Sequence, residues 1–258
     1  MNSVIVILKR ELRSYFLSPV AYAVMVMFLL ISGYFFYSGM VFYGMASFEA
    51  SRMAQYMGPQ ELDMASFVLR PLFGNMGVVM LLLAPLVTMR LFSEEMKNGS
   101  IELLLTWPVT GLQLTLGKYL AALGLFGAML SVTFVYTALA SIYGPVAWGA
   151  VAAAYLGLLL LAASFVALGM FISTLTENQI ISAAVSFGSL LMLWVISWTV
   201  GSDSGPLAET LRHISILEHM ETFAKGVIDT KDLVYYLSFI FLFIFLTLRS
   251  LESRSWRA

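Results

Sequence analysis

The sequence predicts an all-α integral membrane protein with about six membrane-spanning helices, and two observations support this fold class. Hydrophobic residues make up 60% of the 258 residues and charged residues only 11%, whereas soluble domains contain about 45–50% and 25%. The apolar residues also fall in uninterrupted runs of about twenty, the length that an α-helix needs to cross a bilayer. Such runs disfavour a transmembrane β-barrel, whose strands are short and alternate in polarity.

The first predicted element is an amphipathic elbow helix over residues 3–17. On a helical wheel a broad apolar face opposes a basic face formed by Lys9, Arg10 and Arg13. This pattern is typical of a helix that lies in the membrane interface and turns its basic face toward anionic lipid headgroups. Ser18-Pro19 suits the start of a new helix. The alternative is a solvated helix that continues directly into the first span.

Six spans follow from the apolar runs, which makes the chain a single transmembrane domain. They are placed near residues 20–43, 72–90, 112–142, 147–174, 178–200 and 233–250. Thr110 and Gln113 have the spacing of a capping box that opens the third span, and Thr176 and Gln179 have the same spacing before the fifth. Pro85 is expected to kink the second span. The first apolar run is too long for the hydrophobic region of a signal peptide, so no cleaved leader is expected.

The distribution of Lys and Arg predicts the orientation. Nine of the fourteen basic residues fall on the side that carries both termini, and the positive-inside rule therefore places both termini in the cytoplasm. The large outer segments are then 44–71 and 201–232. The second of these is expected to form two short helices, either as a cap without chemistry or as a face for a partner or substrate through His219, Phe223 and Lys225.

The residue types needed for chemistry are largely missing. The chain has no cysteine, which excludes disulfides and thiolate metal sites. Two histidines and scattered acids in the outer segment do not form a metal-ligand pattern, and no charged residue can be placed securely inside a span, which disfavours an ion-coupled carrier. Residues 111–118 lack the spacing of a phosphate-binding loop. We expect no catalytic residue, no metal, no cofactor in this chain and no nucleic-acid partner.

The most distinctive stretch is the charged segment 93–107 between the second and third spans. Asn98-Gly99 is a turn signal, and Trp107-Pro108 stops the short apolar run before it. The segment is therefore expected to be an ordered helix beside the membrane that a partner could grip. Its charged residues are Glu94, Glu95, Lys97 and Glu102.

Residues 94–110 (EEMKNGSIELLLTWPVT) and 116–120 (LGKYL) resemble the motif of the membrane subunits of ABC-2 type (type V exporter-like) ABC transporters. Lys97-Asn98 stands where the family often has a basic pair. The resemblance covers nearly the whole chain, including the elbow helix and the helical outer loop. Residues 175–179 and 219–229 are similar to the branch of gliding-motility-associated and copper-site-maturation permeases.

This resemblance implies a permease that forms a dimer, with a second copy or a related permease, and that binds separate ATPase subunits holding ATP and Mg²⁺. The elbow helix and the 93–107 element would sit against the ATPase and transmit its movement. Glu102 is expected to contact either the ATPase or the elbow near Arg10 or Arg13. The residues expected to carry coupling are Glu94, Glu95, Lys97, Asn98, Gly99 and Glu102.

Three other functions compete with export of an unidentified substrate. In the first, ATP hydrolysis would drive mechanical action on a periplasmic or envelope protein without transport. In the second, the chain would be a homo-oligomeric channel, although no filter-like segment is present. In the third, it would be a membrane-embedded enzyme, for which the sequence offers no convergent catalytic set.

Overall fold

The computed structural model describes residues 3–57, 63–99, 110–196 and 215–255, and these residues form helices joined by short connections. In chain order the helices are α1 (Ser3–Leu17), α2 (Pro19–Met57), the π-helix η1 (Ala65–Leu69), α3 (Arg70–Thr88), α4 (Ser93–Lys97), α6 (Gly111–Tyr143), α7 (Trp148–Ser173), α8 (Gln179–Val195), α10 (Glu218–Ala224) and α11 (Thr230–Ser255). No strand occurs in this part of the chain, so the predicted all-α class is confirmed.

Among the residues that the structure describes, five helices are long and apolar enough to cross a membrane. They cover Pro19–Met53, Ala65–Lys97, Gly111–Tyr143, Trp148–Ser173 and Thr230–Ser253. The predicted fifth span, 178–200, corresponds to the shorter apolar helix α8, beyond which residues 197–214 lie outside the described part of the chain. Five of the six predicted spans thus have the length and composition for crossing, and α8 supplies 17 residues of the sixth.

Two local predictions need correction. Helix α2 runs on to Met57 instead of ending near 43, because the polar continuation contains Ala, Met and Glu, which favour helix, and no proline that would stop it. The capping box at Thr176 is absent: Asn178 is the N-cap of α8, and its Oδ1 accepts a hydrogen bond from the Ile180 amide at 2.9 Å. By contrast, the box of Thr110 and Gln113 at the start of α6 is confirmed in both directions.

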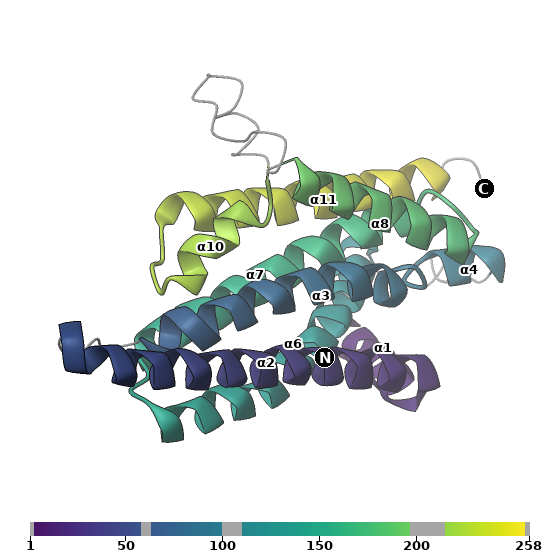
Figure 1. Ribbon diagram of the computed structural model, residues 1–258. Coiled ribbons are helices and arrows are strands. Elements are labelled where there is room, and N and C mark those ends of the chain that lie inside the picture. The colour runs from purple at the N-terminus through teal and green to yellow at the C-terminus, as the bar shows by residue number, and fades with distance from the viewer. Residues whose placement is uncertain (1–2, 58–62, 100–109, 197–214, 256–258) are drawn as a thin grey trace.

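Helix α7 lies at the centre of the bundle. It contacts α3, α6, α8, α10 and α11, and Figure 1 shows α3 and α7 side by side between α2 and α6 on one face and α8 and α11 on the other. We refer to the end with α4 and the first turns of α6 as the α4 end, and to the end with α10 and the first turn of α3 as the α10 end.

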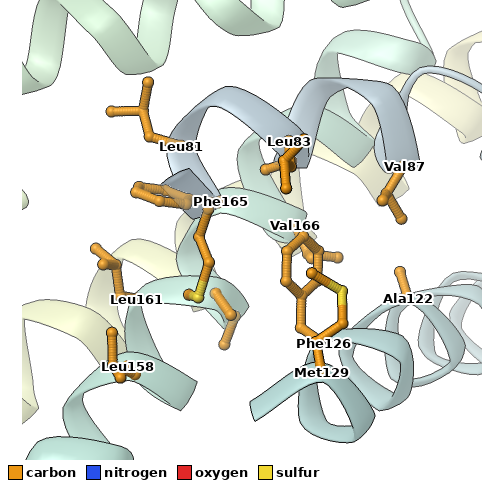
Figure 2. Packing of buried hydrophobic residues seen from close by; sticks show 14 of the residues in the cluster. Leu81, Leu83, Val87, Ala122, Phe126, Met129, Leu158, Leu161, Phe165 and Val166 are labelled. Carbon is orange, nitrogen blue, oxygen red and sulfur yellow. The ribbon is translucent and has the colours of Figure 1, made fainter. Parts of the chain in front are cut away.

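The core forms where α3, α6 and α7 meet. Figure 2 shows side chains of these three helices interdigitating, among them Leu81, Leu83, Val87, Ala122, Phe126, Met129, Leu158, Leu161, Phe165 and Val166. Since lipid tails are as apolar as these side chains, close packing contributes more than the hydrophobic effect to helix association in a membrane. Gly169 on α7 is one such close contact, because a Cβ there would lie 2.7 Å from the Cβ of Thr88 on α3.

We therefore expect Gly169→Ala to separate α3 from α7 and to lower the free energy of unfolding by about 1–3 kcal/mol. Thermal unfolding of the purified chain in mild detergent measures this loss. The matched control is Gly127→Ala on α6, where an added Cβ meets no atom within 4 Å and helix propensity favours alanine by up to about 1 kcal/mol. Equal effects of the two substitutions would contradict this account of the α3–α7 contact.

Candidate functional site

The candidate site lies at the α4 end, where α1 packs against the start of α6. Gly117 allows the close approach of these two helices, because a Cβ at this position would lie 2.7 Å from Cγ2 of Ile7. Five residues further along α1, Leu12 lies against Gly124, where an added Cβ would lie 3.3 Å from Cδ2 of Leu12. The amphipathic helix α1 is thus seated on α6 through glycines spaced seven residues apart, which share one helical face.

A buried lysine next to this contact connects three helices. The Lys118 side chain on α6 is 3% exposed, and its Nζ lies 2.8 Å from Oε1 of Glu95 on α4 and 3.4 Å from Oε1 of Glu11 on α1. Arg10 extends the network: its Nη2 lies 2.8 Å from Oε1 of Glu11 and 3.6 Å from Oε1 of Glu95. Two carboxylates and two cations therefore hold α1, α4 and α6 together.

The surroundings of Glu11 favour its ionised form. Burial opposes ionisation of Glu11, but the positive charges of Lys118 and Arg10 outweigh it and hold the pKa of this carboxyl below its ordinary value. Lys118 also lies 5.4 Å from the ring centroid of Phe92, within the range of a cation–π interaction. A lysine removed from water needs such partners, because an unpaired buried charge is costly.

Helix α4 is fixed on its inner side and open on its outer side. Ser93 Oγ donates a hydrogen bond to the Ser173 carbonyl at the end of α7, at 3.0 Å, and Phe92 and Met96 are buried. The helix ends at Lys97 with Asn98 as its C-cap, and Gly99 follows with a φ of 67°, a left-handed conformation that suits glycine. Its exposed surface is formed by Glu94, Lys97, Asn98 and Gly99.

A polar notch extends this exposed surface. It has a volume of about 490 Å³ and lies between Lys97 of α4 and the α7–α8 connection. The connection contributes Glu177 and Asn178, and the first turn of α8 contributes Gln179 and Ile180. The α4 end therefore presents a charged, hollowed surface that is backed by an internal ion network.

A model of the ABC-2 family transporter proteins matches residues 5–253. The chain belongs to the ABC-2 transporter family. It is accordingly a multi-pass membrane protein and the permease component of an ABC transporter, and the resemblance based on residues 94–120 is confirmed. Membership implies an ABC ATPase as partner and, typically, a dimer of permeases. No curated protein matches the chain.

The structure of this ABC-2 permease divides the residues expected to carry coupling into two groups. Glu94, Lys97, Asn98 and Gly99 are exposed, whereas Glu95 is turned inward, with 14% of its side chain exposed. Residues 100–109 lie outside the described part, and with them Glu102 and the rest of the 93–107 element. The side chains of Lys9, Arg10 and Arg13 are all exposed on α1, as a basic face requires.

Sequence reasoning missed Glu11 and Lys118 as a pair. It used Lys118 in the positive-inside count and in the 116–120 motif but assigned it no partner, although this lysine is the eighth residue of a long apolar helix, and a charge in that position needs a partner. The buried charge predicts that Lys118 has a partner, but it does not identify Glu11, which lies 107 positions away in the sequence.

Two of the three residues expected to form an outer contact surface are buried at the α10 end. His219 is 8% exposed and its Nδ1 lies 2.6 Å from Oδ1 of Asp232. Phe223 is fully buried and packs against Gly157, where an added Cβ would lie 2.5 Å from the Cβ of Phe223. The structure thus corrects the prediction for His219 and Phe223, whose apolar or aromatic surfaces fasten α10 to α7 and α11. Lys225 is exposed.

We expect Lys118→Met to lower the free energy of unfolding by about 3–5 kcal/mol, because Glu11 and Glu95 are then left close together without their shared cation. Thermal unfolding in detergent measures this effect. The triple variant Glu11→Gln/Glu95→Gln/Lys118→Met should recover most of the loss, since it removes the buried charges as a set. Arg10→Gln is the control: the Arg10 side chain is 54% exposed, and such pairs contribute about 0–1 kcal/mol. A triple variant as unstable as Lys118→Met would show that the ion network is not the cause.

Proposed function

We propose that this chain is the permease subunit that couples ATP hydrolysis by a separate ATPase subunit to the export or movement of a substrate. The observation that carries the proposal is the double character of α4. Its outer side is exposed and charged, and its inner side is tied to α1 and α6 through Glu95 and to α7 through Ser93. A helix held in this way transmits a push from outside to three other helices.

The coupling follows from these contacts. The ATPase can bias the permease only through a contact that differs between its nucleotide states, and Glu94, Lys97 and Asn98 offer charge-assisted hydrogen bonds to it. Displacement of α4 then moves Lys118 and the start of α6. Since Glu11 shares the same lysine, the elbow helix α1 moves with it. Shifts of packed helices of this kind are a common route of conformational switching.

In this proposal ATP and Mg²⁺ belong to the partner ATPase, and the permease contributes no catalytic residue. The α4 end faces the cytoplasm of a bacterial inner membrane, as the distribution of Lys and Arg favours. The permease works as a dimer, formed with a second copy or a related permease.

A second candidate is a non-transporting assembly that acts mechanically on an envelope protein. Its support is the way in which polar groups inside the spans are used. Hydroxyl groups of Thr133, Ser164 and Thr247 donate to carbonyls of their own helices, as is usual for such residues in apolar surroundings. These spans therefore show little polar lining for a hydrophilic cargo. Proteins captured with the permease from the opposite side of the membrane would distinguish the two functions.

We expect a charge exchange on the exposed surface of α4, Glu94→Lys with Lys97→Glu, to release the ATPase without unfolding the permease. The exchange keeps the net charge and leaves Glu95 and Ser93 in place. Affinity capture of the full chain in mild detergent, followed by mass spectrometry and an ATPase assay, measures the result. The amount of captured ATPase should fall by at least about fivefold, because each exchanged side chain then faces a like charge on the ATPase.

Arg52→Glu on α2 is the matched control, since this cation is exposed at the α10 end. It should leave the captured ATPase unchanged. Unchanged capture with the α4 exchange, in a chain whose thermal unfolding matches the parent, would refute α4 as the docking element. Absence of any ATPase from the parent eluate would instead favour the channel or the enzyme.

A further inference from the structure

A second hollow lies at the α10 end, on the opposite side of the molecule from α4. It is enclosed by α3, α8 and α10 and has a volume of about 360 Å³, within the about 300–1,000 Å³ that is typical of small-molecule sites. Nothing in the coupling function uses it. Its lining residues are Arg70, Gly74, Val78, Trp194, Leu217, Met220, Glu221, Ala224 and Lys225.

The cavity is formed by two helical faces turned toward each other. On α3, Arg70, Gly74 and Val78 follow each other at intervals of four and so lie on one face. The opposing face of α10 contributes Met220 and Ala224, again four residues apart. Gly74 keeps the space open, because a Cβ at this position would meet no atom within 4 Å. The result is an apolar slot with its polar residues at the rim.

Among the residues that line the cavity, cations outnumber carboxylates by one, and the exposed carboxylate of Asp63 outside the lining also interacts electrostatically with Arg70. The ionisable residues of the lining are Arg70, Lys225 and Glu221. Lys225 Nζ lies 3.4 Å from Glu221 Oε2, but both side chains are more than half exposed, and such a pair contributes at most about 1 kcal/mol. Arg70 forms no ion pair with any residue that the structure describes. One guanidinium and one weakly held ammonium thus face an apolar slot.

We propose that this cavity binds an anionic phospholipid, with its phosphate against Arg70 and Lys225 and one acyl chain along Gly74, Val78 and Met220. Arg70 starts α3 and is the sixth residue of the apolar span Ala65–Lys97, so it lies within about two helical turns of the end of the span, near which lipid headgroups are expected. A guanidinium fits phosphate oxygens in a bidentate manner. Trp194 at the edge of the slot is the residue type that favours this boundary. A soluble anion would leave the apolar walls unused, and a zwitterionic headgroup would bring its own cation toward Arg70.

The lipid preference of the purified full chain tests this proposal. The chain is exchanged into mixed micelles that contain equal amounts of phosphatidylglycerol and phosphatidylcholine, and the bound lipid is counted by native mass spectrometry. The parent should retain phosphatidylglycerol preferentially. Arg70→Gln and Lys225→Gln should each reduce this preference about fivefold, the effect of one cation near an anionic lipid surface. Glu221→Gln should increase it, because it frees Lys225. Arg52→Gln, an exposed cation outside the cavity, should leave it unchanged.

Four results would overturn the proposal. The first is an equal loss of preference with Arg52→Gln, which would indicate general surface charge. The second is competition by glycerol phosphate as effective as that by phosphatidylglycerol, which would indicate a soluble anion. The third is a lower thermal stability of Arg70→Gln in lipid-free detergent than that of the parent, which would show that the cation serves the fold. Gly74→Leu, which fills the slot without changing charge, should abolish lipid retention, and full retention would likewise contradict the proposal.

Discussion

The ion network around Lys118 is the interaction on which the α4 end depends. A lysine with 3% of its side chain exposed needs carboxylate partners, and here two carboxylates come from two helices that both precede α6 in the chain. Glu11 brings α1 to α6, and Glu95 brings α4 to the same point. The same charges that make the site costly to bury also link the positions of the three helices, because separating any one of them would leave a buried charge without its partner.

Small residues play the corresponding role along the rest of the bundle. Gly117 admits α1 to α6, Gly169 admits α3 to α7, and Gly157 admits α10 to α7. At each glycine a neighbouring helix occupies the space that a larger side chain would fill. Direct contacts between the helices therefore fix their positions. The two ends differ in consequence: the α4 end is joined by ions, whereas the α10 end is joined by the buried side chains of Phe223 and Met220.

The sequence predicted what depends on local composition. Apolar runs located the long helices, Thr110 located the start of α6, and the motif from residue 94 onward led to the family, which the family match confirmed. The prediction of the α2 boundary was wrong because the predicted apolar run ends near residue 43, whereas residues that favour helix continue to Met57. Lys118 and Glu11 escaped prediction since their pairing spans 107 positions. The burial of Phe223 depends on Gly157, which is also far away in the sequence and leaves no local signal.

Helix α2 also has a mechanical consequence. Its 39 residues correspond to about 58 Å of rigid helix, nearly twice the about 30 Å of the hydrocarbon core. Its first turn adjoins the elbow, where the Ser18 amide donates to the Tyr15 carbonyl at 3.0 Å. The helix is therefore a rigid arm that pivots near its first turn, beside the elbow. Over the length given by the helical rise, a tilt of about 10° displaces the far tip by about 10 Å, so a small rotation at the elbow becomes a large displacement across the membrane.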